Sequence, residues 1–114
     1  MTEAIRLNPI DAKAYYNRGN AYKRTGEYDR GITDFTEAIR LNPKDADVYC
    51  CRGTTYGYKG EYDKAIADCS EAIRLDPKMP VAYYDRGLAF SKKGNKAKVD
   101  EDFAQAKKLG YKEK

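Results

Sequence analysis

Histidine is absent from this chain of 114 residues, and there are only three cysteines, Cys50, Cys51 and Cys69. Without histidine, the most common general base for a serine or cysteine nucleophile is missing. The cysteines form no C-x-x-C pair, whereas zinc needs about four ligands at spaced positions. We therefore expect no catalytic residues, no metal site and no cofactor, and we interpret the chain as not being an enzyme.

Long apolar runs and low-complexity linkers are also lacking. No segment approaches the length of a membrane-spanning helix, and no secretory segment is recognisable. Together with the odd number of cysteines, this favours a reducing compartment, and we expect a cytoplasmic protein. No glycine-rich phosphate loop precedes a helix. The net charge of +4 does not demand nucleic acid as a partner.

The sequence repeats itself with a fixed period. The segment AIRLNP ends at Pro9 and again at Pro43, and AIRLDP ends at Pro77. These prolines are 34 residues apart (9 to 43 and 43 to 77). Glycines keep the same spacing, at Gly19, Gly53 and Gly87 and again at Gly26, Gly60 and Gly94. A period of this size predicts stacked structural repeats.

Each full unit has the pattern of two helices. Apolar residues recur at helical spacing over residues 12–24, and Asp11 is placed to cap this first helix. Gly26 is expected to end it in the left-handed conformation. A second helix is expected over residues 28–41, and Pro43 marks the break after it.

We expect a single domain over residues 1–114. Its parts are the end of a truncated repeat at 1–9, a first repeat at 12–45, a second at 46–79, and a third at 80–114 that includes a C-terminal capping helix and a tail.

The two ends of the array differ in character. In the third unit, Asp100 and Lys107 replace the isoleucines that should face a following unit, which is typical of a terminal cap. Residues 110–114 are expected to be a loose basic tail. At the other end, Ile5 and Leu7 lack a partner helix, so an apolar edge and weak self-association are expected.

The units share an early aromatic residue, a glycine, a second aromatic, then small and apolar residues and a late proline. They are Tyr15, Gly19, Tyr22, Gly31, Phe35, Ala38 and Pro43; Tyr49, Gly53, Tyr56, Ala65, Cys69, Ala72 and Pro77; and Tyr83, Gly87, Phe90, Val99, Phe103 and Ala106. This pattern resembles the tetratricopeptide repeat (TPR) family. The resemblance implies an all-α fold, a right-handed α-solenoid of antiparallel helix pairs, and a function as a protein–protein interaction scaffold.

All three units depart from the family by carrying arginine where leucine is usual before the glycine. An aspartate also recurs in every second helix, and an unpaired buried charge would be costly. We predict three ion pairs, Arg18–Asp34, Arg52–Asp68 and Arg86–Asp102. The alternative is that these groups are solvated and the arginine stems only cover apolar surface.

By resemblance to the family, the first helix of each unit lines a concave groove that binds a peptide or partner segment. Tyrosines offer rigid contact area, and basic groups favour carboxylates, so we expect a partner with acidic and apolar side chains. The candidate groove residues are Lys13, Tyr16, Asn20, Lys23, Arg24, Thr54, Tyr58, Tyr84, Leu88 and Lys92.

Some family members hold the C-terminal carboxylate of chaperone tails with a clamp of lysine, asparagine and arginine. Asn20 matches one clamp position. Tyr16, Cys51, Val81 and Asp85 stand where lysine, asparagine, lysine and arginine are expected. The sequence therefore argues against chaperone-tail binding.

Two other functions compete with groove binding. The first is a self-associating assembly module that uses the open N-terminal end. The second is RNA binding by helical repeats, which the modest charge makes less favourable. No membrane partner is expected.

Overall fold

The computed structural model describes residues 9–112, which contain six α-helices and no strand. The helices are α2 (Pro9–Arg24), α3 (Tyr28–Leu41), α4 (Ala46–Lys59), α5 (Tyr62–Leu75), α6 (Pro80–Lys93) and α7 (Lys96–Lys108). The expected all-α repeat solenoid is therefore confirmed. None of the described helices is long and apolar enough to cross a membrane.

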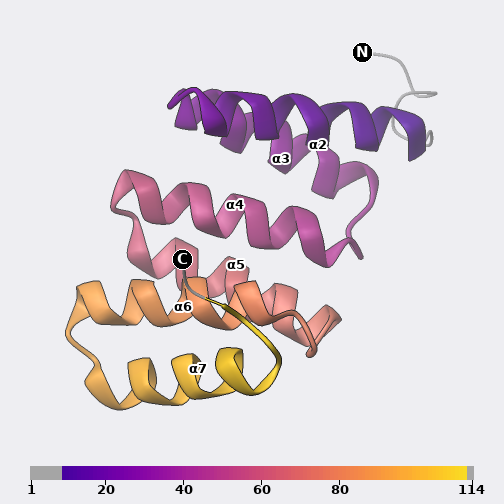
Figure 1. Cartoon of the computed structure of the whole chain (residues 1–114). Coiled ribbons are helices and arrows are strands. Elements are labelled where there is room, and N and C mark those ends of the chain that lie inside the picture. Colours follow the sequence, from indigo (N-terminus) through magenta and orange to yellow (C-terminus); the bar gives the residue numbers. More distant parts are fainter. Residues whose placement is uncertain (1–8, 113–114) are drawn as a thin grey trace.

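The helices form three stacked pairs, α2 with α3, α4 with α5 and α6 with α7. Figure 1 shows α2, α4 and α6 following one another on the near face, with α3 and α5 behind them. The stack is elongated, with extents of 46 × 25 × 24 Å. The first helices of successive pairs therefore share one face of the molecule.

Glycine ends the first helix of every pair. Gly26, Gly60 and Gly94 have φ values of 83°, 85° and 81°, a left-handed conformation that glycine adopts without a side-chain clash. The residue after each glycine donates its N–H to a carbonyl one turn back, as in the bond from Glu61 to Tyr56. Each turn is thus closed within the backbone.

The start of α2 differs from the prediction. The helix begins at Pro9 rather than near Ala12, so Asp11 lies in the first turn and is not its N-cap. Proline is well suited to a first helical turn, because its fixed φ is helical and its missing N–H would have no partner there. Asp11 still places a negative charge near the positive end of the helix dipole.

The two helices of each pair approach closely at a glycine. A Cβ atom added at Gly19 would lie 2.8 Å from the Phe35 ring, and one at Gly87 would lie 2.6 Å from the Phe103 ring. Phe35 and Cys69, the equivalent residues of the first two units, are both fully buried. The glycines therefore provide the space for the core residue of the facing helix.

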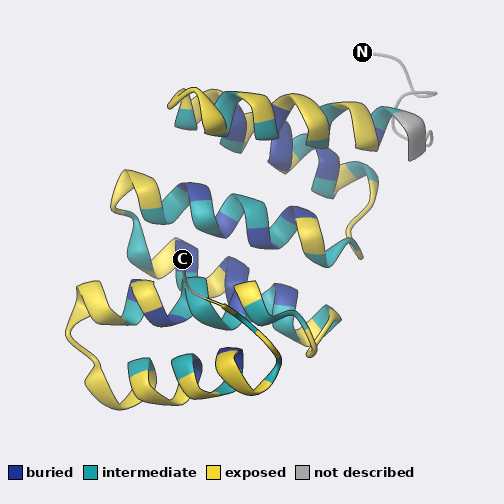
Figure 2. Cartoon of the chain, viewed as in Figure 1, coloured by how far each residue is buried: buried dark blue, intermediate teal, exposed yellow. Residues whose placement is uncertain are grey.

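Successive pairs pack through a second set of buried residues. Val48 of α4 joins Phe35 and Ala38 of α3, and Ala82 of α6 joins Cys50 and Ala72. Ile39 and Ile73 pack against these clusters, as expected of the positions that face a following unit. Figure 2 shows the buried residues on the helix sides that face neighbouring helices.

The predicted arginine–aspartate pairs are confirmed in all three units. Each arginine donates from Nε to one carboxylate oxygen and from a terminal nitrogen to the other. The shortest distances are 2.7 Å for Arg18–Asp34, 2.7 Å for Arg52–Asp68 and 2.8 Å for Arg86–Asp102. The alternative of fully solvated groups is therefore wrong, because each aspartate is buried.

Arg52 makes two further kinds of contact. The Arg52 guanidinium lies 5.8 Å from the ring centres of both Tyr49 and Tyr56. Its third nitrogen donates to the Thr36 hydroxyl of the preceding pair at 3.1 Å, and Arg86 bonds Ser70 in the same way. Arg52 and Arg86 therefore each link their own helix pair to the pair before it.

Residues 110–112 of the expected loose tail are held against the last helix pair through Tyr111, and residues 113 and 114 lie outside the described residues. The Tyr111 N–H donates to the Ala106 carbonyl at 2.9 Å, and its ring stacks on Tyr84 at 4.2 Å. Asp100 and Lys107 are exposed, as expected. The predicted apolar edge at Ile5 and Leu7 lies outside the described residues.

Candidate functional site

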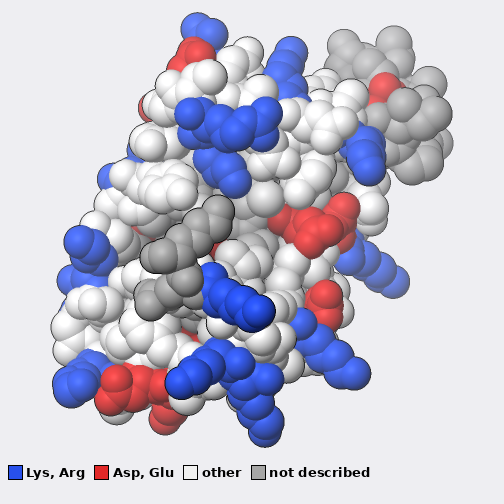
Figure 3. Space-filling view, in the orientation of Figure 1, with Lys and Arg blue, Asp and Glu red and all other residues white. Residues whose placement is uncertain are grey.

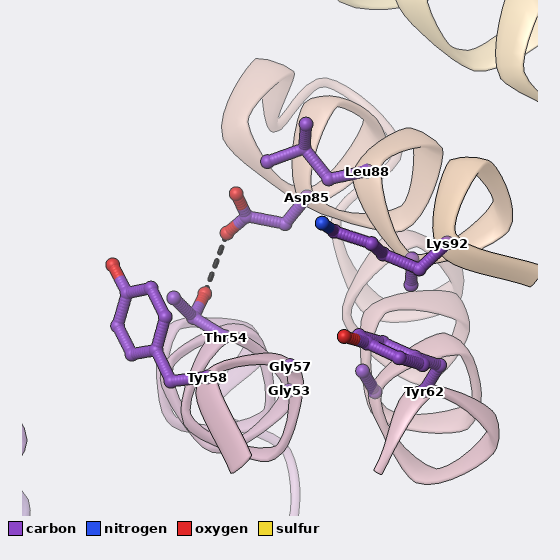
Figure 4. Close-up of a pocket in the computed structure, with 10 residues that line it drawn as sticks. Gly53, Thr54, Gly57, Tyr58, Tyr62, Asp85, Leu88 and Lys92 are labelled. Carbon is purple, nitrogen blue, oxygen red and sulfur yellow. Dashed lines mark hydrogen bonds between the residues drawn. The ribbon is translucent and has the colours of Figure 1, made fainter. Parts of the chain in front are cut away.

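A pocket of about 260 Å³ opens between α4, α5 and α6. All three helices contribute to its lining, which combines small residues, two tyrosines and three longer side chains from α6. The lining residues are Gly53, Thr54, Gly57, Tyr58, Tyr62, Ala65, Asp85, Leu88, Ala89 and Lys92. Figure 4 shows the labelled side chains surrounding one space, with Asp85 and Leu88 on one side and Tyr58 and Tyr62 on others.

The space exists because the middle unit has a glycine where its neighbours have larger residues. Gly57 takes the place of Lys23 in the first unit and Ser91 in the third. A Cβ atom added at Gly57 would meet only the Ala65 methyl group, at 4.0 Å. The wall at this point is therefore formed by backbone and by a small side chain.

Asp85 is the acidic group of the pocket. The Thr54 hydroxyl donates to its Oδ2 atom at 2.5 Å, and this bond joins α4 to α6. Burial raises the pKa of Asp85, while the Thr54 hydrogen bond and the charge of Lys23 act in the opposite direction. Thr54 is the only described residue that bonds to this carboxylate.

The exposed apolar surface is concentrated on this side of the molecule. Among the described residues, the large hydrophobic side chains that remain exposed are Tyr58, Val81 and Leu88, at 60%, 39% and 43%. All three belong to α4 or α6. The Tyr58 ring also lies 5.4 Å from the Tyr28 ring, which begins α3. The face formed by the first helices therefore carries the apolar surface available to a partner.

Charge is distributed unevenly over the same face. In Figure 3, lysine and arginine gather over α2, where the described residues include Lys13, Lys23 and Arg24, and an acidic patch lies where α4 begins. Asp47 stands in the first turn of α4, and its pKa is raised by burial and then by the charges of Asp45 and Asp76. The face therefore carries both positive and negative charge.

The structure brings together four of the ten predicted groove residues in the pocket, namely Thr54, Tyr58, Leu88 and Lys92. On α2, Lys13 and Arg24 are exposed and Lys23 is half-buried. Tyr16 and Asn20 are half-buried beside α4, where the Cys51 thiol lies 3.7 Å from the Tyr16 hydroxyl. Burial, as the largest effect, raises the pKa of Tyr16 to about 12.

Tyr84 lies apart from these residues. Its ring is stacked between Phe103 at 5.1 Å and Tyr111 at 4.2 Å, beside a separate hollow that also includes Lys107. The last helix and the segment after it therefore cover part of the Tyr84 ring that a partner would otherwise contact.

The cysteines are core residues in this structure. Cys50 and Cys69 are buried, and none of the three forms a disulfide. Burial raises the pKa of all three thiols, that of Cys50 to about 12, so they are protonated at neutral pH. Within residues 9–112, no group of three or more metal-binding side chains occurs.

Six lining residues of the pocket are not among the ten predicted groove residues, and two of them, Tyr62 and Asp85, carry polar groups. Tyr62 belongs to a second helix, and the prediction considered only first helices as lining the groove. Asp85 was noted only as a mismatch with the clamp. A signal was present in the sequence, because aspartate here replaces Asn17 and Cys51 of the sister units.

The repeat pattern and the helix pairs agree with a known family. A family model described as the tetratricopeptide repeat matches residues 12–45 and 46–79. The chain belongs to the tetratricopeptide repeat family. No curated protein is significantly similar to it in sequence.

Solved TPR structures are similar over most of the chain. The second TPR domain of Spaghetti (RPAP3), bound to the HSP90 peptide SRMEEVD, is 30% identical, with a TM-score of 0.87 and coverage of 95% of this chain and 99% of that one. The Arabidopsis OM64 TPR domain is 28% identical, with a TM-score of 0.86 and coverage of 87% and 82%. The TPR2B domain in the pHsp70 complex of yeast Sti1 is 26% identical, with a TM-score of 0.84 and coverage of 86% and 78%.

Proposed function

We propose that this protein is an interaction module that binds a peptide segment of a partner protein along the face formed by α2, α4 and α6. The observation that carries the proposal is the position of Tyr58, Val81 and Leu88, the exposed large hydrophobic residues of the described chain. Exposed apolar groups that border a pocket are typical of a binding site. Similar TPR domains in complexes with chaperone peptides support a peptide-binding function.

The partner should differ from the chaperone peptides of those relatives. Val81 and Asp85 occupy two positions where the carboxylate clamp needs lysine and arginine. The half-buried carboxylate of Asp85 would repel the C-terminal carboxylate of such a peptide. We expect the peptide SRMEEVD not to bind. Lys13, Lys23 and Arg24 of α2 are suited to acidic side chains, and the exposed apolar side chains of α4 and α6 are suited to apolar ones.

Display of random peptides on the purified chain tests the proposal without knowledge of the partner. We expect the selection to enrich peptides that contain apolar residues. Binding of an enriched peptide, measured by fluorescence anisotropy, should weaken by roughly tenfold or more in Leu88→Ala, because the variant removes an apolar wall. Gly57→Leu should weaken it too, because its side chain fills the pocket.

The control variant is Glu101→Ala, an exposed residue of α7 that should leave the affinity unchanged. Circular dichroism of each variant shows whether the fold is kept. Enriched peptides that bind the two pocket variants as tightly as the wild type would contradict the proposal.

A further inference from the structure

Asp85 differs from the buried aspartates of this protein because it forms no ion pair with a residue of the described chain. Asp34, Asp68 and Asp102 each receive two hydrogen bonds from an arginine, through Nε and a terminal nitrogen. In the described chain, Asp85 receives one hydrogen bond, from the Thr54 hydroxyl. A carboxylate shielded from water is stabilised by further donors or by an opposite charge.

The paired aspartates of this chain show which groups surround such a carboxylate. Arg52 lies between the rings of Tyr49 and Tyr56, at 5.8 Å from each centre, while it pairs with Asp68. The site of Arg18 is built in the same way, with Tyr15 and Tyr22 at 5.9 and 5.8 Å. The protein thus repeats an arrangement of two tyrosines, one aspartate and one arginine.

The pocket contains the same elements except the arginine. Tyr58 and Tyr62 lie on two of its sides, and the carboxylate of Asp85 points into the space between the helices (Figure 4). Gly57 and Leu88 add the apolar surface on which the methylene groups of a long side chain can pack. The volume of about 260 Å³ is on the scale of one large side chain.

We infer that this pocket binds an arginine side chain of the partner peptide, with the guanidinium on the Asp85 carboxylate and between the two tyrosine rings. The inference rests on the proposed function and makes it more specific. The peptide would carry acidic residues toward α2 and an arginine toward α6, in keeping with the mixed charge of the face. Arginine fits better than lysine because its planar group can bond a carboxylate and stack on aromatic rings together.

Two lysines on this face place positive charge near Asp85, which opposes the binding of an arginine there and provides a test. The ammonium group of Lys92 points into the same space (Figure 4), and the charge of Lys23 lowers the pKa of Asp85. Neither lysine forms an ion pair with Asp85 in the described chain. If the occupant is an arginine, Lys92 repels it, so removal of that charge should tighten binding. If the occupant is an acidic side chain, the same change should weaken binding.

The experiment is a peptide display selection run in parallel on the wild-type chain and on Asp85→Asn. The variant keeps the shape of the side chain and an oxygen for Thr54, and circular dichroism shows whether its fold is kept. We expect the wild type to enrich arginine at one position of the selected peptides. The Asp85→Asn selection should lose that arginine and keep the apolar enrichment.

Anisotropy on one enriched peptide then gives the size of the effect. We expect Asp85→Asn, and separately replacement of the peptide arginine by alanine, to weaken binding about tenfold to a hundredfold, as for a hydrogen bond between charged groups. Replacement of the arginine by lysine should weaken it less. Lys92→Ala should strengthen binding severalfold.

The outcomes separate this inference from the proposed function. Enrichment of apolar residues without arginine would overturn the inference and leave the peptide-binding function standing. Enrichment of acidic residues whose binding is lost in Lys92→Ala would also overturn it. A wild-type selection that enriches no sequence at all would overturn both.

Discussion

Each glycine at the contact between paired helices lies against a large or buried side chain, and this reverses the usual effect of an alanine substitution. In an ordinary helix, alanine is more favourable than glycine by about 1 kcal/mol. At Gly87, however, the new Cβ atom would lie 2.6 Å from the Phe103 ring, so the ring or the helix has to move. The steric conflict there exceeds the gain in helix propensity.

We predict that Gly87→Ala lowers the free energy of unfolding by about 1–3 kcal/mol, the usual cost of overpacking a core. Gly57→Ala is the matched control, because its Cβ atom would lie 4.0 Å from the Ala65 methyl group. That variant should raise the free energy by up to about 1 kcal/mol. Urea unfolding followed by circular dichroism measures both. An increase in stability in both variants would show that the helices do not approach closely at Gly87.

Asp85 is the residue at which binding and stability oppose each other. Burial raises the pKa of its carboxyl group in the folded chain, so the folded state favours the protonated form. The ionised carboxylate therefore destabilises the folded chain at pH values above the pKa that Asp85 has in the folded state. This destabilisation disappears as the pH falls below the ordinary aspartate value of about 3.9, where the group is protonated in both states.

We therefore predict that Asp85→Asn unfolds at a higher temperature than the wild type at pH 7, and that this difference shrinks as the pH is lowered toward about 4. The exposed Asp100→Asn serves as the control and should show little difference at any pH. Thermal unfolding at several pH values tests this. A variant that melts below the wild type at pH 7 would mean that the ionised carboxylate stabilises the fold.

The helix pair is the element that the arginine–aspartate contacts hold together. Arg52 joins α4 to Asp68 of α5 and to Thr36 of α3, whereas Arg18 has no described contact with a preceding pair. The Arg52 side chain, which has the additional contact, is 19% exposed, whereas the Arg18 side chain is 61% exposed. Water therefore reaches the first pair more easily than the second.

We predict that Arg52→Met lowers the free energy of unfolding by about 3–5 kcal/mol, because it leaves Asp68 buried without a partner. Arg18→Met should cost less, since water can approach Asp34 from the exposed side. The double variant Arg52→Met with Asp68→Leu should recover most of the loss, as an apolar pair often replaces a buried ion pair without cost. Urea unfolding is the measurement. Equal losses in the two single variants, or no recovery in the double variant, would count against this account.

At the scale of the whole molecule, the described helix pairs form a stack in which each pair packs mainly against the pair next to it. The middle pair, α4 and α5, packs against helices on both sides, whereas the other two pairs have one described neighbouring pair each. In such arrays the stability of a unit depends on its interfaces with adjacent units. Opening should therefore begin at the outer pairs.

We predict that amide hydrogen exchange is slowest in α4 and α5, because opening them requires both interfaces to separate. Exchange in α2, α3 and α7 should be faster, with the segment around Tyr111 fastest of the described chain. Mass spectrometry of peptic fragments resolves these regions. Uniform protection across all six helices would indicate that the stack unfolds as one cooperative unit instead.

The repeat sequence predicted the fold closely. The helix pairs follow from apolar spacing and from glycines such as Gly60, whose conformation is a local property of the backbone. The pairing of Arg52 with Asp68 could also be anticipated, because the same two residue types recur at the same places in three units. The helix start at Pro9 was missed, since a proline after a repeat can either end one helix or begin the next.

The sequence alone determined the helix pairs, their order and the contacts that recur in every repeat, because those depend on residues at fixed spacing. The binding face was only partly predictable, because it depends on residues that differ between units. Tertiary structure decided that Tyr62 of a second helix joins the pocket, that Tyr84 is covered by Tyr111, and that Asp85 is shielded from water with one hydroxyl as its partner. These features arise where helices distant in sequence meet, so their burial and charge depend on packing that no single segment specifies.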